Sequence, residues 1–167
     1  MYNHRIAKET IVLDLIEYLR SLNQNSLIIG VGNPLRGDDG FGPALVAGLQ
    51  GRTGIRLMDA EEVPEAFLDK AVEMAPDKLL IADAVALGGL PGEAALMSPE
   101  SLGQKIAIST HNLPLLMFIK FFKEQSPNTE VMLLGVQPKG IEFGKELSPE
   151  IKKTIESLVG IITDNKP

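Results

Sequence analysis

Residues 27–42 are the most informative part of the chain and read Leu27-Ile28-Ile29-Gly30-Val31-Gly32-Asn33-Pro34-Leu35-Arg36-Gly37-Asp38-Asp39-Gly40-Phe41-Gly42. The apolar beginning is typical of a buried strand, and the glycines allow the tight turn and the close backbone approach that follow it. The adjacent aspartates Asp38 and Asp39 fall where the next helix should begin. This stretch predicts a strand, a turn that carries two carboxylates, and a helix.

A glycine-rich turn between a strand and a helix also forms the phosphate cradle of nucleotide-binding proteins. The dinucleotide fingerprint has a third glycine three residues after the second, but Gly32 is followed by Asn33, Pro34 and Leu35. The Gly-Lys-Ser/Thr of a P-loop is also absent from the turn. Because two carboxylates would repel a phosphate, the turn is better suited to a cation.

The composition fits one globular domain with an acidic balance. A chain of 167 residues is long enough to bury roughly 70% of the surface that its unfolded form exposes. The formal charge of −6, from 16 basic and 22 acidic residues, makes nucleic acid an unexpected partner. The sequence has no cysteine, which excludes disulfides, thiolate metal ligands and a cysteine nucleophile.

The first residues, Met1 to Arg5, lead into charged residues rather than into the apolar core of a signal peptide. No apolar stretch approaches the length of a membrane span. We therefore expect a cytoplasmic protein without membrane insertion.

Apolar periodicity predicts alternating strands and helices along the whole chain. The expected helices cover about residues 7–22, 41–50, 64–74, 113–123 and 149–162, and the expected strands cover 27–31, 55–58, 78–82, 93–97, 105–108 and 130–136. This alternation predicts an α/β fold in three layers, with a twisted, mostly parallel sheet and helices on both faces.

Three side chains of the metal-binding type follow separate strands of this sheet. Asp39 follows the first strand, Asp83 ends the apolar run that begins at Leu79, and His111 follows the predicted strand 105–108. Since the carboxyl ends of parallel strands lie at one edge of the sheet, we expect the three to meet there. Two carboxylates and an imidazole suit a divalent ion such as nickel or zinc.

Each of these residues also has a structural interpretation. Asp38 or Asp39 could cap the helix that starts near Gly40, and Asp83 could form a turn. His111 lies at a plausible helix start, where Thr110 or Asn112 would be the cap.

Four motifs in order give the chain a resemblance to a known family. They are Gly30–Gly40, Leu80–Ala84, Thr110–Pro114 and Gly135–Pro138. The chain resembles the hydrogenase maturation proteases, endopeptidases that trim the C-terminal tail from a [NiFe]-hydrogenase large-subunit precursor. The branch that serves membrane-bound or formate-linked hydrogenases is the most similar. The resemblance implies a phosphorylase/hydrolase-like fold. We expect a single domain over residues 1–167, in which residues 1–25 form an N-terminal helical extension outside the resemblance. This extension would mediate self-association or cover sheet surface.

The resemblance also implies a set of metal contacts and a partner. By position, the metal ligands of the family correspond to Asp39, Asp83 and His111, and Asp39 stands where many members have a glutamate. The metal would be nickel already inserted into the large-subunit precursor, and ions such as zinc, cadmium or calcium would occupy the same site in vitro. The resemblance does not predict the oligomeric state.

The chemistry of peptide-bond cleavage is a hypothesis. The sequence has no Gly-x-Ser-x-Gly elbow, no His-Glu-x-x-His helix and no cysteine. We expect the bound ion to polarise the scissile carbonyl or to activate a water, with Asp39 or Asp38 as the proton acceptor and Asp83 as a further catalytic group. A scaffold or chaperone that binds the same precursor without cutting it is the alternative.

Three further residues are candidates for contacts with the substrate. Asp59, followed by Glu61 and Glu62, would line a groove for a basic tail or would simply belong to a solvated acidic loop. Gln137 would bond an extended substrate backbone or would belong to an ordinary turn beside Pro138. Asn33 in the glycine-rich turn is the third candidate.

Overall fold

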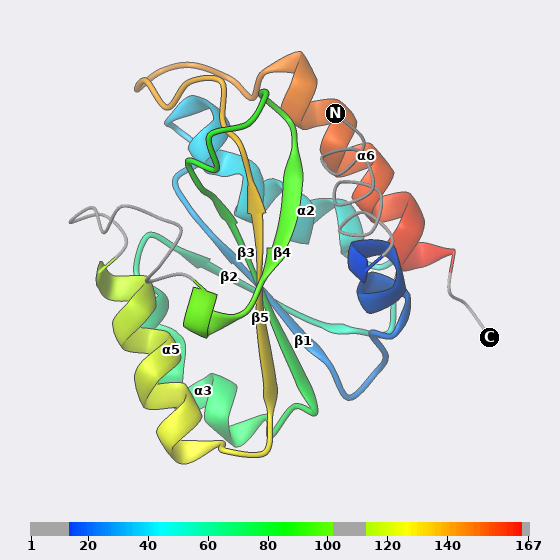
Figure 1. The fold of residues 1–167 in the computed structure, drawn as a ribbon, viewed down its shortest axis with the longest axis vertical. Helices are drawn as coiled ribbons and strands as arrows, with labels where there is room; N and C mark the ends of the chain where they lie inside the picture. The colour runs from blue at the N-terminus through cyan, green and yellow to red at the C-terminus, as the bar shows by residue number, and fades with distance from the viewer. Residues whose placement is uncertain (1–13, 102–112, 165–167) are drawn as a thin grey trace, which may run out of the picture.

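Five strands form one sheet in the computed structural model, which describes residues 14–101 and 113–164. They are β1 (Leu27–Val31), β2 (Arg56–Glu61), β3 (Lys78–Ala84), β4 (Ala94–Met97) and β5 (Glu130–Val136). Their order across the sheet is β2-β1-β3-β5-β4 (Figure 1). All neighbours are parallel except β4, which pairs antiparallel with β5. The predicted α/β fold with a mostly parallel sheet is confirmed.

Helices cover both faces of this sheet because the strand residues alternate between two apolar clusters. On one face, Ile28 and Leu80 pack with α2 (Phe41–Leu49) and α6 (Pro149–Thr163). On the other face, Ile29 and Ile81 pack with residues of α3 (Leu68–Glu73) and α5 (Leu113–Gln125). Figure 1 shows these two helical layers on either side of the twisted strands.

The N-terminal helix is part of the core in the residues that the structure describes. Residues 14–20 are helical, whereas the beginning of the predicted helix lies outside the described residues. Leu15, Leu19 and Leu22 are buried in the same cluster as residues of α2 and α6. This segment therefore covers sheet and helix surface within the domain.

Two strands are longer than the sequence predicted. β2 continues past Met58 to Glu61 because Glu61 still pairs with Val31, across a register shift in β1, and its carbonyl accepts a hydrogen bond from the Gly32 N–H (2.7 Å). β3 continues to Ala84, because Asp83 still pairs with Gly135 of β5. Asp83 thus lies inside the strand rather than after it.

The other boundaries differ by small amounts, with one exception. The predicted helix 64–74 is divided into a 3₁₀-helix, η2 (Pro64–Phe67), and α3, because Phe67 has φ −104° and ψ 4°, outside the helical region. The predicted strand 105–108 lies outside the described residues. No helix among the residues that the structure describes is long and apolar enough to cross a membrane.

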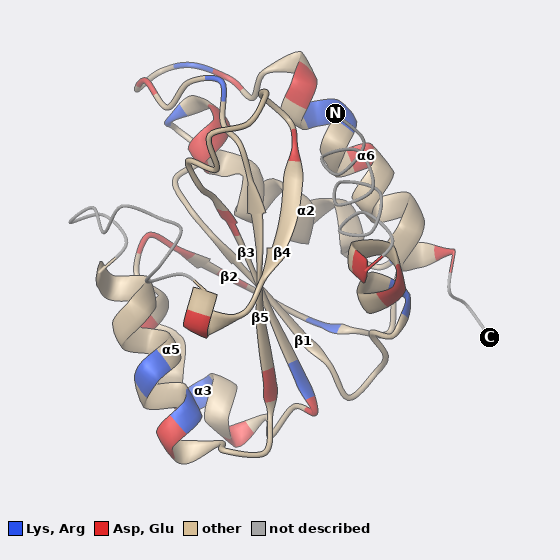
Figure 2. Ribbon diagram, viewed as in Figure 1, with Lys and Arg blue, Asp and Glu red and all other residues tan. Residues whose placement is uncertain are grey.

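The first turn of α2 lies directly against the sheet. A Cβ atom on Gly42 would collide with the carbonyl oxygen of Ala82 and with the backbone of Val31, and one on Gly30 would collide with the carbonyl of Gly42. Glycine is therefore required at both positions for this close approach. The contact fixes α2 over β1 and β3 and holds the preceding turn at the carboxyl end of the sheet. Figure 2 shows acidic and basic residues interspersed along the described part of the ribbon.

Candidate functional site

The glycine-rich turn brings Asp39 to the carboxyl edge of the sheet, beside the end of β3. After β1 the chain turns into a short 3₁₀-helix, η1 (Gly37–Gly40), which contains both aspartates and leads directly into α2. Asp83 is the second-last residue of β3. It has the same parity along this strand as Leu79 and Ile81, so its side chain lies on the face covered by α5.

Asp83 is a buried carboxyl group with a strongly shifted pKa. Its exposure is only 7%. Burial is the main cause that raises the pKa of Asp83 from 3.8 to about 7, the negative charge of Asp39 adds to the rise, and a hydrogen bond from the Ala84 N–H opposes it. The influence of Asp39 means that the two carboxylates, 44 positions apart in the sequence, lie near each other in the fold. A shared proton or a bound cation would stabilise two such neighbouring carboxylates.

The third predicted ligand, His111, lies outside the described residues. Within the described ranges, no three histidine, cysteine, aspartate or glutamate side chains form a group that could hold a metal ion. Of the three predicted ligands, the structure therefore describes Asp39 and Asp83.

Asp39 also closes the glycine-rich turn. Its Oδ2 accepts a hydrogen bond from the Asn33 N–H at 3.0 Å. The Asn33 side chain is bonded on both sides, since its Oδ1 accepts from the Leu35 N–H (2.8 Å) and its Nδ2 donates to Oε2 of Glu62 (3.0 Å). The alternative that Asp38 or Asp39 caps the following helix is wrong, because neither η1 nor α2 has a side-chain hydrogen bond at its N-cap.

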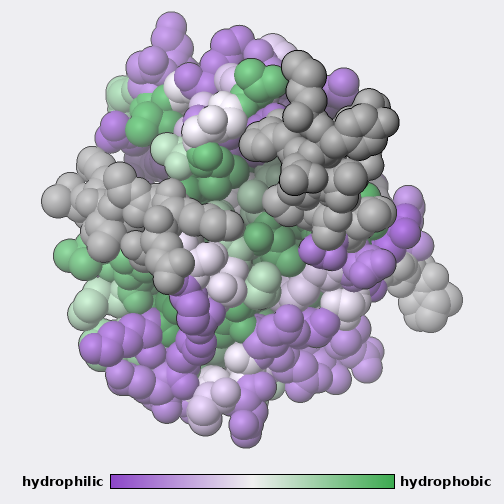
Figure 3. Space-filling view, in the orientation of Figure 1, coloured by the Kyte–Doolittle hydropathy of each residue, from purple (hydrophilic) through white to green (hydrophobic). Residues whose placement is uncertain are grey.

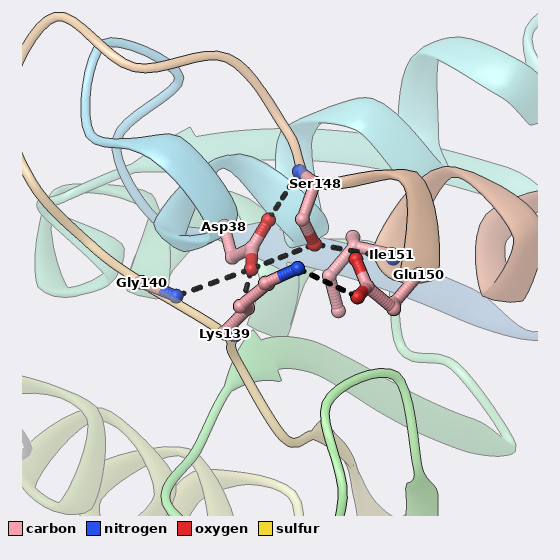
Figure 4. A network of polar contacts seen from close by, with 6 residues as sticks. All are labelled: Asp38, Lys139, Gly140, Ser148, Glu150 and Ile151. Carbon is pink, nitrogen blue, oxygen red and sulfur yellow. Dashed lines mark hydrogen bonds and ion pairs between the residues drawn. The ribbon is translucent and has the colours of Figure 1, made fainter.

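Asp38 is buried and holds the loop that follows β5 (Figure 4). Its Oδ1 accepts from the Ser148 N–H at 2.7 Å. Its Oδ2 accepts from the Lys139 N–H at 2.7 Å, from the Ser148 hydroxyl at 2.9 Å and from the Gly140 N–H at 3.4 Å. With four donors on two oxygens, Asp38 is a structural anchor, which makes Asp39 the better candidate for the proton acceptor.

Sequence reasoning missed the residues that complete this anchor. Ser148 is the N-cap of α6, and its Oγ accepts from the Ile151 N–H at 3.4 Å while it donates to Asp38. Lys139 forms an ion pair with Glu150 at 2.8 Å beside it. The sequence signal was present, because Ser148-Pro149 before an amphipathic helix is a typical helix start.

Gln137 and Asp59, both predicted to contact substrate, make contacts within the protein. Oε1 of Gln137 accepts from the N–H groups of Leu87 (2.7 Å) and Gly88 (3.0 Å), and its Nε2 donates to the Pro138 carbonyl (3.1 Å). Gln137 thus fixes the loop after β3. Asp59 is exposed in β2, where its Oδ1 accepts from the Glu61 N–H at 3.0 Å.

Comparison with known proteins shows the family of the chain. Residues 44–165 match the family of hydrogenase maturation proteases. The chain belongs to that family. The hydrogenase 3 maturation protease of Escherichia coli (strain K12) is 33% identical to it over 134 residues, which cover 79% of this chain and 85% of the relative.

Solved structures of the family have the same fold as this peptidase. The crystal structure of a [NiFe] hydrogenase maturation protease HycI from Thermococcus kodakarensis KOD1 superposes with a TM-score of 0.80 at 32% identity, over 90% of this chain and 97% of that one. The solution structure of the endopeptidase HycI from Escherichia coli gives a TM-score of 0.75 at 30% identity, over 83% of this chain and 89% of that one. The fold and the peptidase activity are therefore shared properties of the family.

Proposed function

We propose that the protein is the endopeptidase that removes the C-terminal extension of a nickel-loaded [NiFe]-hydrogenase large-subunit precursor. The observation that carries the proposal is the coupled pair Asp39 and Asp83, which stands at the carboxyl edge of the sheet in a chain of the maturation protease family. The names of its relatives, which include a hydrogenase 3 maturation protease, support the hydrogenase precursor as substrate.

Nickel in this proposal belongs to the substrate rather than to the enzyme. Asp39 and Asp83 supply two oxygen ligands, and His111 is the proposed third ligand. In support, Asp83 lies on the face of the sheet covered by α5, and His111 precedes the first residue of that helix, Leu113, by two positions. A set of two carboxylates and one imidazole leaves coordination positions for ligands that the precursor already provides.

The carboxylate pair also fits the proposed chemistry. The negative charges of buried Asp83 and half-buried Asp39 repel each other, and a divalent cation between them relieves that repulsion. The ion supplies Lewis-acid activation of the scissile carbonyl or of a water molecule. Asp39 accepts the proton of the attacking water, and the amide nitrogen leaves protonated as the C–N bond breaks.

The test is the mass of the large subunit after incubation with this protein. Precursor from the same organism is prepared with and without nickel, and each form is incubated with the wild-type protein. The proposal predicts loss of the C-terminal extension from the nickel-loaded form alone. Equal trimming of both forms would contradict recognition through nickel, and stable binding with unchanged mass would identify a scaffold instead.

A further inference from the structure

Three apolar side chains are exposed on two loops that lie against each other. Leu35 is 60% exposed, Ile141 47% and Phe143 74%. We call the two segments that carry them, residues 33–37 and 139–147, the paired loops. In Figure 3 green apolar atoms stand among purple ones at the upper left, where Figure 1 draws the end of the 139–147 segment. Exposed apolar groups that cluster are typical of a protein-binding surface.

The backbone of the paired loops is held by a network of hydrogen bonds. The Gly37 N–H donates to the Lys145 carbonyl at 3.0 Å, and the Gly144 N–H donates to the Leu35 carbonyl at 2.8 Å. The Asp38 N–H donates to the Gly140 carbonyl at 2.9 Å, in addition to the four bonds that its carboxylate accepts. Because the loops are already ordered, a partner that binds them has little ordering entropy to overcome.

The paired loops are continuous with the candidate catalytic residues. Asp38 bonds to the second loop, and the next residue, Asp39, belongs to the coupled pair with Asp83. The first of the paired loops ends at Gly37, two residues before Asp39, so the paired loops adjoin the candidate site. Charged residues of both signs, such as Lys145 and Glu146, alternate along the 139–147 segment (Figure 2) and give the apolar centre a polar surround.

We propose that the paired loops are the docking surface for the hydrogenase large-subunit precursor. The exposed apolar side chains of the loops would contact an apolar patch on the precursor, next to the C-terminal segment of the precursor. This inference rests on the proposed function. A transient enzyme–substrate contact fits the small size of the surface, because a stable protein interface needs about 20–30 residues a side. A second copy of this chain is the competing occupant, and the experiment distinguishes it.

The experiment measures cleavage kinetics on nickel-loaded large-subunit precursor for the wild-type protein, Phe143→Ser and Ile141→Ser. We expect each variant to raise KM by about tenfold, with a change in kcat of less than about twofold, since an exposed anchor acts in binding rather than in chemistry. Phe121→Ser is the matched control, because Phe121 is also an exposed phenylalanine but lies on α5. It should leave both constants unchanged.

Each result either supports or overturns the docking surface. Wild-type KM in both loop variants would overturn it while leaving the proposed function intact, whereas failure of the wild-type protein to cleave would overturn the proposed function itself. If a loop variant sediments differently from the wild-type protein in the absence of precursor but has the same KM, a second copy of this chain occupies the surface and the docking proposal is wrong. Phe143→Leu, which retains an apolar side chain, should recover most of the affinity, and its failure to do so would also count against apolar docking.

Discussion

Asp38 and Asp39 are neighbours in the chain, but their carboxylates have opposite surroundings. Asp38 is buried among hydrogen-bond donors from the 139–148 segment, which stabilise its charge. Asp39 lies close enough to Asp83 to raise the pKa of that carboxyl group. The first arrangement stabilises the fold, and the second favours a bound cation. Substitutions at the two positions should therefore have different effects.

Asp38→Asn should destabilise the protein by about 2–4 kcal/mol, because an amide presents N–H groups to donors that need an acceptor. Asp39→Asn should change the free energy of unfolding by less than about 1 kcal/mol and should abolish cleavage of nickel-loaded precursor. Urea denaturation and a single-turnover cleavage assay measure the two effects. Full cleavage activity in Asp39→Asn would show that Asp39 is not the proton acceptor.

Asp83→Asn should stabilise the protein at alkaline pH. The folded-state pKa of Asp83 is raised to about 7 from 3.8, so folding is favoured while the group is protonated. The stabilising contribution of protonated Asp83 to the free energy of unfolding is fully present below about pH 4 and is lost as the pH rises through 7. At pH 8 the variant avoids the buried charge, and we expect it to be more stable by roughly 2–4 kcal/mol.

Denaturant unfolding of wild type and Asp83→Asn at pH 4, 6 and 8 measures this difference. The gain should grow with pH and should be close to zero at pH 4. Asp59→Asn is the matched control, because Asp59 is exposed and its substitution should have no such pH dependence. A gain that is the same at all three pH values would contradict a buried, proton-binding Asp83.

At the scale of elements, the contact between α2 and the sheet depends on the absence of a side chain at Gly42. Gly42→Ala should cost more than about 3 kcal/mol, because its Cβ would meet the backbone of Val31 and Ala82. Gly160→Ala is the control in α6, where a Cβ has open space, and it should stabilise by about 0.5–1 kcal/mol. Thermal unfolding of both variants measures the contrast, and equal effects would contradict the close approach of α2.

The elements themselves were predictable where apolar periodicity is strong. The strands around Ile29, Ile81 and Leu133 and the helix from Pro149 were found because both faces of the sheet are buried and α6 is amphipathic. The ends of β2 and β3 were not found. These ends contain the acidic residues Asp59, Glu61 and Asp83, which are uncommon in strands, and pairing with neighbouring strands keeps them in the sheet.

At the scale of the whole molecule, sheet topology explains how much of the site could be predicted. Parallel strands bring their carboxyl ends to one edge, which is why Asp39 and Asp83 could be paired from the sequence. The anchoring role of Asp38 could not be predicted from the sequence, because its partners Lys139 and Ser148 are more than 100 positions away and belong to an irregular segment. Periodicity does not report such contacts.

The most direct measurement of the central claim is anomalous diffraction at the nickel absorption edge, on crystals of the protein grown with Ni²⁺. We predict a single strong peak within about 2.0–2.2 Å of the ligand atoms of Asp39, Asp83 and His111. Crystals of Asp83→Asn treated in the same way should have a weaker peak. A nickel ion bound elsewhere, with Asp39 and Asp83 both outside its coordination sphere, would contradict the account.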